Sequence, residues 1–462
     1  MKIVHLTPGT GNFHCGSCLR DNHLVKALRR MGHDVTMVPL YLPLVTDDEP
    51  ASGSAPVQVG GINLYLRQKL SVIRWLPRFL FRFLDSPGVL RAAADRASMT
   101  SAKELGEMTL ETLRGQNGRQ AADWQRLVEW IGTEGKPDLI SLSNGLLNGL
   151  APAIRQTLGV PVLCSLQGED SFLDTLPEPY KTKAWDAFRA NNSSVSRYLA
   201  TSDYYRGVMK DRLQLTDDQI VTVRNGMDFT AYAPAANPPA VPVIGYLARL
   251  CYGKGLQTLV EAFVRLAPRL PEARLSLAGT TTAADAPFIA SQKSTLAKAG
   301  LTDRVTWQEN LTFDEKVRHL QSLSVLSVPA TYGEAFGLYV IEALACGVPV
   351  VEPEHAGLTE LVQATGGGVL CTPDDPEALA DALESLLQDK PRRLALAQLG
   401  RETVLAEFTA DRMARDFAAV AADLLGVLKT VPVRQWWVIA SPCKQVPPAE
   451  DALDFPNNEM MN

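Results

Sequence analysis

Short runs of β-branched and aliphatic residues alternate with longer amphipathic segments along almost the whole chain of 462 residues. This alternation is typical of parallel sheets, because parallel strands need a crossover connection, which is usually a helix. In the first half it predicts strands at 3–6, 35–39, 139–143, 162–166 and 220–223. In the second half it predicts strands at 243–247, 275–278, 305–307, 325–328, 348–351 and 369–371. Clear helical segments between strands are expected at 19–31 and 203–213.

One break in the alternation divides the chain into two halves. Residues 232–240 read YAPAANPPA, a sequence without an apolar period that is typical of a linker. We therefore expect an α/β protein of two Rossmann-like, doubly wound domains, 1–230 and 241–427, joined by a linker at 231–240. Such sheets bind ligands at the carboxyl ends of their strands, so facing domains would form a site in the cleft between them. Residues 428–462 are expected to be an irregular tail.

Charge and apolar patterning exclude several classes of protein. The 45 Lys and Arg against 51 Asp and Glu leave a formal net charge of −6, which argues against a nucleic-acid partner. The first apolar run is too short for a signal peptide, and no stretch of about 18 uninterrupted apolar residues occurs, so a cytoplasmic chain is expected. The seven cysteines, mostly within apolar runs, indicate reduced thiols.

The most informative segment, GEAFGLYVIEALACGVPVV at 333–351, joins a glycine-containing turn to a helix. Unpaired amides at a helix start, together with the helix dipole, can bind phosphate or sugar oxygens. The amides at this start are those of Phe336, Gly337 and Leu338. Glu334 lies in the turn and Glu342 on the helix, so their carboxylates can accept hydrogen bonds from two polyol groups of one ligand.

This segment resembles the hallmark of the retaining GT-B glycosyltransferases of glycosyltransferase family 4, relatives of glycogen and sucrose synthases, in which two glutamates are separated by seven residues. The resemblance implies that Glu334 contacts the donor sugar and Glu342 the nucleotide ribose. It also implies that the helix-start amides hold the transferred sugar and the diphosphate. The implied co-substrate is a nucleotide diphosphate sugar, with uridine as the expected base and no further cofactor required.

A second and a third segment match the same family. In GYLARLCYGKGL at 245–256, Arg249 and Lys254 can both reach one diphosphate, and the resemblance implies that they stabilise it as it departs. The segment TVRNGMD at 222–228 is similar to an Asn-Gly-x-Asp segment that precedes the second domain in the family. Arg224 stands where family members commonly have proline.

The turn after the first strand departs from a dinucleotide fingerprint, because His14 replaces its last glycine. Family members often have a glycine pair here, and Gly16 is the candidate for backbone that approaches the donor phosphate. Cys15 and Cys18 form a Cys-x-x-Cys at a helix start, a place that favours thiolates and so allows redox or metal chemistry. The pair is half of a four-ligand zinc site, which His14 or His23 could complete. The alternative is that the two cysteines only pack and shape the loop.

The end of the strand predicted at 162–166 also departs from the family. Many relatives carry a histidine where this chain has Gln167, which can hydrogen-bond a sugar hydroxyl but cannot titrate. Glu169 and Asp170 follow, and they can bind acceptor or sugar hydroxyls or else cap the next helix.

Residues 64–84 would form a helix with one basic and one aromatic stripe, kinked at Pro77. The stripes consist of Arg74, Arg78 and Arg82, and of Trp75, Phe79 and Phe83. Such a helix suits peripheral contact with an anionic membrane or an anionic acceptor. The alternative is an amphipathic helix that covers the core of the first domain.

The function expected from the resemblance is transfer of a hexosyl group from a nucleotide diphosphate sugar to a hydroxyl of a glycan, glycolipid or small molecule, with retention of configuration. No Asp-x-Asp triplet of the kind that holds a metal-bound diphosphate occurs, so no essential metal is expected. Two other classes stay open. One is a sugar-nucleotide epimerase or phosphorylase on the same fold, and the other is a non-catalytic sugar-nucleotide or glycan-binding protein.

Overall fold

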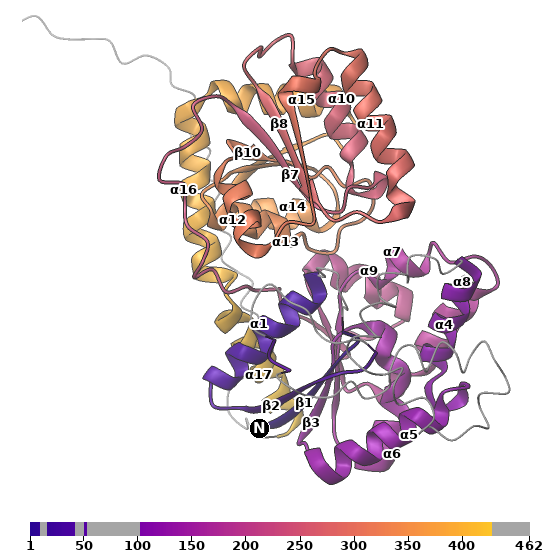
Figure 1. Cartoon of the computed structure of the whole chain (residues 1–462). Coiled ribbons are helices and arrows are strands. Elements are labelled where there is room, and N and C mark those ends of the chain that lie inside the picture. The colour runs from indigo at the N-terminus through magenta and orange to yellow at the C-terminus, as the bar shows by residue number, and fades with distance from the viewer. Residues whose placement is uncertain (10–15, 42–49, 53–101, 427–462) are drawn as a thin grey trace, which may run out of the picture.

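The computed structural model describes residues 1–9, 16–41, 50–52 and 102–426, and Figure 1 shows them as two α/β domains. Each domain contains a six-stranded sheet. The first sheet is parallel and has the order β2-β1-β3-β4-β5-β6. Its strands are β1 (Lys2–Thr7), β2 (Asp34–Pro39), β3 (Leu139–Leu142), β4 (Val162–Leu166), β5 (Arg197–Ala200) and β6 (Ile220–Thr222).

The second sheet is parallel as well, with the order β12-β11-β10-β7-β8-β9. Its strands are β7 (Val243–Leu247), β8 (Arg274–Gly279), β9 (Val305–Glu309), β10 (Val325–Leu326), β11 (Val350–Pro353) and β12 (Gly368–Cys371). The fold class expected from the alternating pattern is therefore confirmed. Both sheets are doubly wound, because strand order reverses next to the first strand of each domain.

The helices lie between the strands as the pattern predicts. In the first domain they are α1 (Gly16–Arg30), α4 (Ala102–Arg114), α5 (Ala121–Trp130), α6 (Ala151–Leu158), α7 (Glu169–Leu173), α8 (Tyr180–Ala190) and α9 (Asp203–Leu213). In the second domain they are α10 (Leu256–Leu266), α11 (Ala286–Lys298), α12 (Phe313–Gln321), α13 (Leu338–Ala345), α14 (Ala356–Thr365), α15 (Pro376–Gln388) and α16 (Lys390–Glu407). The last described helix is α17 (Ala410–Leu424).

Both faces of the first sheet are buried. Val4 and Leu6 on β1 face one core cluster, whereas Ile3 faces another that contains residues of α1 and α17. Successive side chains of a strand point to opposite faces, so a strand buried on both sides must be apolar at nearly every position. This is why most strands of the first sheet are visible in the sequence as apolar runs.

One strand was missed by the sequence analysis. β5 has only four residues, and it begins with Arg197 and Tyr198, which broke the apolar run. It pairs with β4 on one side and β6 on the other, and Tyr198 is 1% exposed. Pairing with two neighbours, and not local propensity, makes this segment a strand.

The last described helix returns to the first domain. Figure 1 shows α17 beside α1, and Met413 and Phe417 belong to the same core cluster as Ile3 of the first sheet. Arg30 of α1 also forms an ion pair with Asp411 at 2.6 Å. Residues 410–424, which the expected boundaries assign to 241–427, thus complete the core of the first domain.

Several sequence predictions lie outside the described residues. They concern the stripes at 64–84, Cys15 with His14, and the tail at 428–462. Within the part of the chain that is described, no helix combines the length and apolarity needed to cross a membrane.

Candidate active site

The turn that precedes α13 and the first residue of that helix lie close to the first domain at two glycines. A Cβ built on Gly16, the first residue of α1, would lie 3.1 Å from Leu338 Cδ1. A Cβ built on Gly168, just beyond β4, would lie 3.9 Å from the Cβ of Ala335. The structure therefore brings together segments that follow the carboxyl ends of β1, β4 and β10. We call residues 333–338 the donor turn from here on.

The donor turn depends on a glycine at its end. Gly337 has a φ of +95°, a left-handed conformation that strains any other residue. A Cβ at this position would also come within 2.8 Å of Leu358 Cδ2. Gly337 turns the chain into α13. As at every helix start, the first amides of α13 lack intrahelical acceptors.

Lys254 and Glu334 form an ion pair at the donor turn. Lys254 ends a short 3₁₀ turn (Tyr252–Lys254) after β7, and its Nζ lies 4.9 Å from the centre of the Tyr332 ring. Burial lowers the pKa of Lys254, but the attraction of Glu334 outweighs this and raises the pKa above its usual value. Burial and the nearby Glu334 carboxylate also raise the pKa of Tyr332 to about 12. The ammonium is therefore held in its charged form beside the helix start.

Arg249 lies on the same loop as Lys254 and has a different partner. Its Nε and Nη2 donate to Asp285 at 3.1 and 3.0 Å. Asp285 also accepts hydrogen bonds from the amide and hydroxyl of Thr282, which fixes the carboxylate in a capping box. The Arg249 side chain remains 49% exposed, so its guanidinium is anchored but open to a ligand.

Glu342 points into the second domain. Its Oε1 accepts hydrogen bonds from the Tyr232 hydroxyl at 2.8 Å and from Lys316 Nζ at 2.9 Å. Each charged side chain predicted to meet the donor thus has an opposite charge beside it. The sequence analysis missed Asp285 and Lys316, since each lies far from its partner in the chain. The Thr282-x-x-Asp285 spacing of a capping box was the only local signal.

Gln167 and Glu169, two of the residues predicted in the first domain, both form hydrogen bonds within that domain. Gln167 donates from Nε2 to the Ser143 carbonyl oxygen at 2.7 Å, which leaves its side-chain oxygen as an acceptor. Glu169 is buried and accepts from the amides of Gly145 and Gln167 at 2.7 and 2.8 Å, and from the Tyr205 hydroxyl at 3.0 Å. Burial raises the pKa of Glu169. Its carboxylate is thus satisfied inside the domain.

Asp170, the next residue, has a buried Oδ1 without a hydrogen-bond partner among the described residues. Its side chain is only partly buried as a whole. Of the two predicted carboxylates, Asp170 is therefore the less fully hydrogen-bonded inside the first domain.

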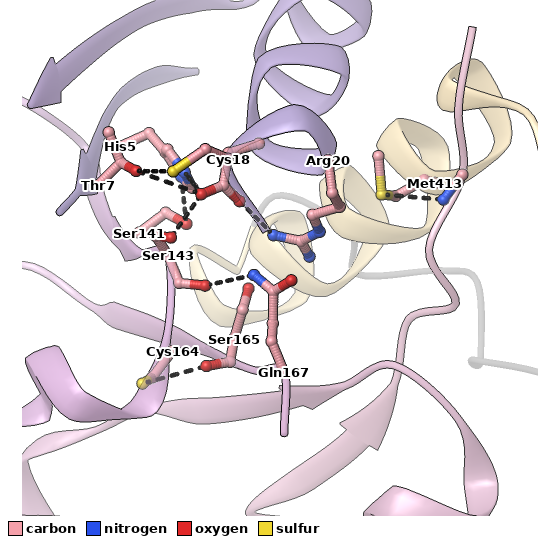
Figure 2. Close-up of polar contacts among 12 residues, drawn as sticks. His5, Thr7, Cys18, Arg20, Ser141, Ser143, Cys164, Ser165, Gln167 and Met413 are labelled. Atoms are coloured by element: carbon pink, nitrogen blue, oxygen red, sulfur yellow. Dashed lines mark hydrogen bonds and ion pairs between the residues drawn. The ribbon is translucent and has the colours of Figure 1, made fainter. Parts of the chain in front are cut away.

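A buried polar cluster is connected to Gln167 through Ser143, whose carbonyl oxygen accepts from Gln167 (Figure 2). Asp21 accepts from Arg20 Nη1 at 2.9 Å and from Ser143 Oγ at 2.5 Å, and it lies 3.4 Å from His5 Nε2. Burial raises the pKa of Asp21, but the charges of His5 and Arg20 outweigh it and hold the pKa below its usual value. The sequence analysis missed this cluster because its members His5, Asp21 and Ser143 come from separate elements of the first domain.

Cys18 is buried, with its Sγ 3.8 Å from Thr7 Oγ1. Across 1–9, 16–41, 50–52 and 102–426, no three His, Cys, Asp or Glu side chains are grouped so that they could hold a metal ion. Cys15 lies outside these ranges.

Two family models match the chain, one in each domain. The model described as "Glycosyl transferases group 1" matches residues 233–403, and the "Glycosyl transferase 4-like domain" matches residues 20–226. The chain belongs to the GT-B glycosyltransferases of the family 4 type. The first match contains the Lys254 and Glu334 pair together with Arg249 and Glu342. The family predicted from the two glutamates is therefore confirmed.

Curated relatives are similar to parts of the chain. It is 33% identical over 192 residues to the lipopolysaccharide core biosynthesis mannosyltransferase LpsB of Rhizobium meliloti, covering 40% of this chain and 53% of that protein. The match thus spans about half of that relative's length. It is 26% identical over 351 residues to the D-inositol 3-phosphate glycosyltransferase of Salinispora tropica, covering 71% of this chain and 72% of that protein.

Solved structures share the fold. The sucrose-phosphate synthase of Thermosynechococcus elongatus aligns with a TM-score of 0.68 at 20% identity, over 93% of this chain and all of that one. Anabaena HepE in complex with UDP and glucose aligns with a TM-score of 0.63 at 17% identity, over 91% of this chain and 99% of that one. At these identities the likeness establishes the GT-B arrangement of the two domains.

Proposed function

We propose that the chain is a retaining glycosyltransferase that moves a hexosyl group from a UDP-sugar to a hydroxyl of a glycan, glycolipid or small-molecule acceptor. One observation carries the proposal. The Lys254 ammonium, the Glu334 carboxylate and the start of α13 converge where Gly16 of the first domain meets Leu338. A cation and free amides suit a diphosphate, and a carboxylate suits sugar hydroxyls.

Donor binding would exchange the partners within this group. The diphosphate takes the Lys254 ammonium and the amides of Phe336, Gly337 and Leu338, which frees the Glu334 carboxylate to accept hydrogen bonds from the sugar. Arg249 adds a second cation, already oriented by Asp285. These groups stabilise the charge that develops on the leaving diphosphate, and they are in place before reaction, so little reorganisation is needed.

Retention follows if bond breaking leads and the acceptor attacks from the face that the diphosphate leaves. The departing phosphate then accepts the acceptor's proton, so no protein base is required. This fits a site in which Gln167 cannot titrate and the Glu169 carboxylate is satisfied inside the first domain. Gln167 contributes a hydrogen-bond acceptor, and Asp170 a second one, for sugar or acceptor hydroxyls.

The base of the donor is part of the proposal. Uridine is supported by the Anabaena structure with bound UDP, whereas one relative is named a GDP-mannose-dependent phosphatidylinositol monomannoside mannosyltransferase. Binding of the two nucleotides therefore has to be compared directly. A cytoplasmic location, with peripheral membrane contact through residues 64–84, rests on the sequence alone.

The test is a thermal-shift series with UDP, GDP, ADP and their common sugar conjugates. A ligand at about 100 times its Kd adds roughly 2.7 kcal/mol of stability, so one base should raise Tm clearly in the wild type. Lys254→Ala should abolish this shift. The matched control is Lys293→Ala, which removes an exposed lysine that packs over Trp307 in the same domain. A shift that survives in Lys254→Ala, or no shift in folded wild-type protein, would contradict the donor-site assignment.

The reaction itself is tested on the nucleotide that binds. We expect a glycosylated acceptor whose anomeric configuration, read by NMR, equals that of the donor. Epimerised sugar nucleotide, or turnover with phosphate alone, would indicate the epimerase or phosphorylase class instead. Binding without turnover across a broad acceptor panel would indicate a non-catalytic protein.

A further inference from the structure

The donor turn is held by the first domain as well as by its own. The Ser202 hydroxyl, at the start of α9, donates to the Ala335 carbonyl oxygen at 2.7 Å. The same oxygen of Ser202 accepts from the Tyr205 amide at 3.1 Å and so caps α9. Tyr204 reaches the turn too, because a Cβ on Gly333 would lie 2.6 Å from the Tyr204 hydroxyl oxygen. The start of α9 is thus tied to the donor turn at two points.

Glu360 on α14 forms a second connection between the two domains. Its Oε2 accepts from the Tyr204 amide at 2.9 Å, and its Oε1 accepts from Arg224 Nη2 at 2.8 Å and Nε at 3.2 Å. The Arg224 and Glu360 side chains are only 13% and 20% exposed, so water weakens their attraction less than at an open surface. Asp203, which belongs to the first domain like Arg224, forms a second ion pair with Arg224 at 3.5 Å.

Helix α14, which carries Glu360, also contacts the donor turn directly. The Gly357 amide donates to the Glu334 carbonyl oxygen at 3.0 Å. A Cβ on Gly357 would lie only 2.6 Å from that oxygen, so the helix and the turn are in direct backbone contact. A narrow recess lined by Ser202, Arg224, Phe336 and Glu360, among others, lies between these elements. The contacts therefore form a closed ring that starts and ends in the first domain.

We propose that Arg224, Glu360 and Ser202 form an interdomain latch that positions the donor turn. The proposal rests on the proposed function in one respect, which is that the turn binds the donor. Because each contact joins the two domains, a rotation of one domain against the other breaks them together. The turn then loses the support of its Ala335 carbonyl and of α14. The three side chains are positioning residues, since they act through the turn.

Arg224 lies where the two domains are joined. It stands two residues beyond the end of β6, close to the point where the Met227 amide donates to the Phe408 carbonyl oxygen at 2.9 Å.

The first test needs no substrate. Hydrogen exchange of residues 335–345 is compared in the ligand-free full chain between the wild type, Arg224→Ala and Glu360→Gln. We expect exchange about tenfold faster in Arg224→Ala, a typical size for coupling between two sites, and a smaller rise in Glu360→Gln, which keeps an acceptor for the Tyr204 amide. The control is Arg119→Ala, which removes an exposed ion pair with Glu107 within the first domain and should change nothing. Equal exchange in Arg224→Ala and the wild type overturns the latch.

The second test is kinetic. Arg224→Ala should lower kcat/KM for the donor about tenfold, and Arg224→Lys should recover most of the loss because an ammonium still pairs with Glu360. If the wild type transfers sugar and Arg224→Ala changes neither exchange nor kcat/KM, the latch is wrong and the proposed function stands. If the wild type binds no nucleotide but Arg224→Ala still accelerates exchange, the proposed function is wrong and the latch on the turn stands.

Discussion

Gly16, the first residue of α1, touches Leu338, the first residue of α13, across the boundary between the two domains. The position of a Cβ on Gly16 lies 3.1 Å from Leu338 Cδ1, which is the movable tip of a side chain. The two helices can start this close to each other because Gly16 has no side chain and the space beside it admits little more than a methyl group. A residue larger than alanine at position 16 would separate the domains beside the proposed donor site.

The first prediction concerns this contact. Gly16→Ala should be tolerated, because the Leu338 tip can shift by a few tenths of an ångström. Gly16→Val should lower kcat/KM by about tenfold or more, since small misplacements of reacting groups are costly. Nucleotide thermal shifts should persist in both variants, because Gly16 offers only its backbone to the donor and the side chains proposed to bind the nucleotide belong to the second domain. Equal kcat/KM for the Val and Ala variants would show that the contact does not limit transfer.

The second prediction concerns Asp285, which orients Arg249. Asp285→Asn keeps the shape of the side chain but weakens the hold on the guanidinium, so kcat/KM should fall about tenfold. Arg249→Ala should cost at least as much, by removing a donor that stabilises the leaving group. If Asp285 acts through Arg249, adding Asp285→Asn to Arg249→Ala should cause no further loss. Additive losses in this double-mutant cycle would mean that Asp285 acts independently.

The third prediction concerns the stability of the first domain. Asp21→Ala should lower the free energy of unfolding by about 3–5 kcal/mol, because it leaves the Arg20 guanidinium buried at 1% exposure without its partner. Urea unfolding at neutral pH measures this loss. Asp217→Ala breaks exposed ion pairs with Arg206 and Lys210 and serves as the control that should change stability by no more than about 1 kcal/mol. A similar small effect for both variants would show that the buried pair contributes little.

The fourth prediction is a pH dependence that arises from His319. Burial lowers the pKa of this histidine from 6.5 to about 4, although its bond to the Tyr246 carbonyl opposes the shift. Above pH 6.5 the ring is neutral in both folded and unfolded chains. As the pH falls from 6.5 towards 4, the unfolded chain binds a proton that the folded chain rejects, so stability falls. The loss between pH 7 and pH 5 should be roughly 2 kcal/mol.

The variant His319→Gln isolates this effect. It keeps polar atoms near Ser276 and Gln308, which contact the ring at 3.3 Å, but it does not titrate. Urea unfolding of both proteins at pH 7 and pH 5 should show a smaller loss in the variant by about the predicted amount. Parallel losses in the two proteins would assign the pH dependence to other groups.

The candidate site could be predicted because its main parts are local in sequence. A turn, a helix start and the glutamates 334 and 342 lie within 19 residues, and Lys254 lies in a loop of its own recognisable sequence. The partners of these residues were not predictable in this way. Asp285 lies 36 residues from Arg249, and Glu360 lies 136 residues from Arg224. The first pair depends on which loops the strand order brings to one edge of the second sheet, and the second pair depends on how the two domains pack.

The sequence by itself determined the strand and helix pattern, the two-domain α/β architecture and the family. The physical reason is that a strand buried on both faces of a sheet must consist mainly of apolar residues, which form a visible run in the sequence. Helix starts depend on a few neighbouring residues and are visible for the same reason. Only the tertiary structure decided that β5 joins the first sheet, that α17 returns to the first domain and that Ser202 holds Ala335. These features depend on contacts between segments that lie far apart in the chain. The energy of such contacts cannot be predicted from a local sequence pattern.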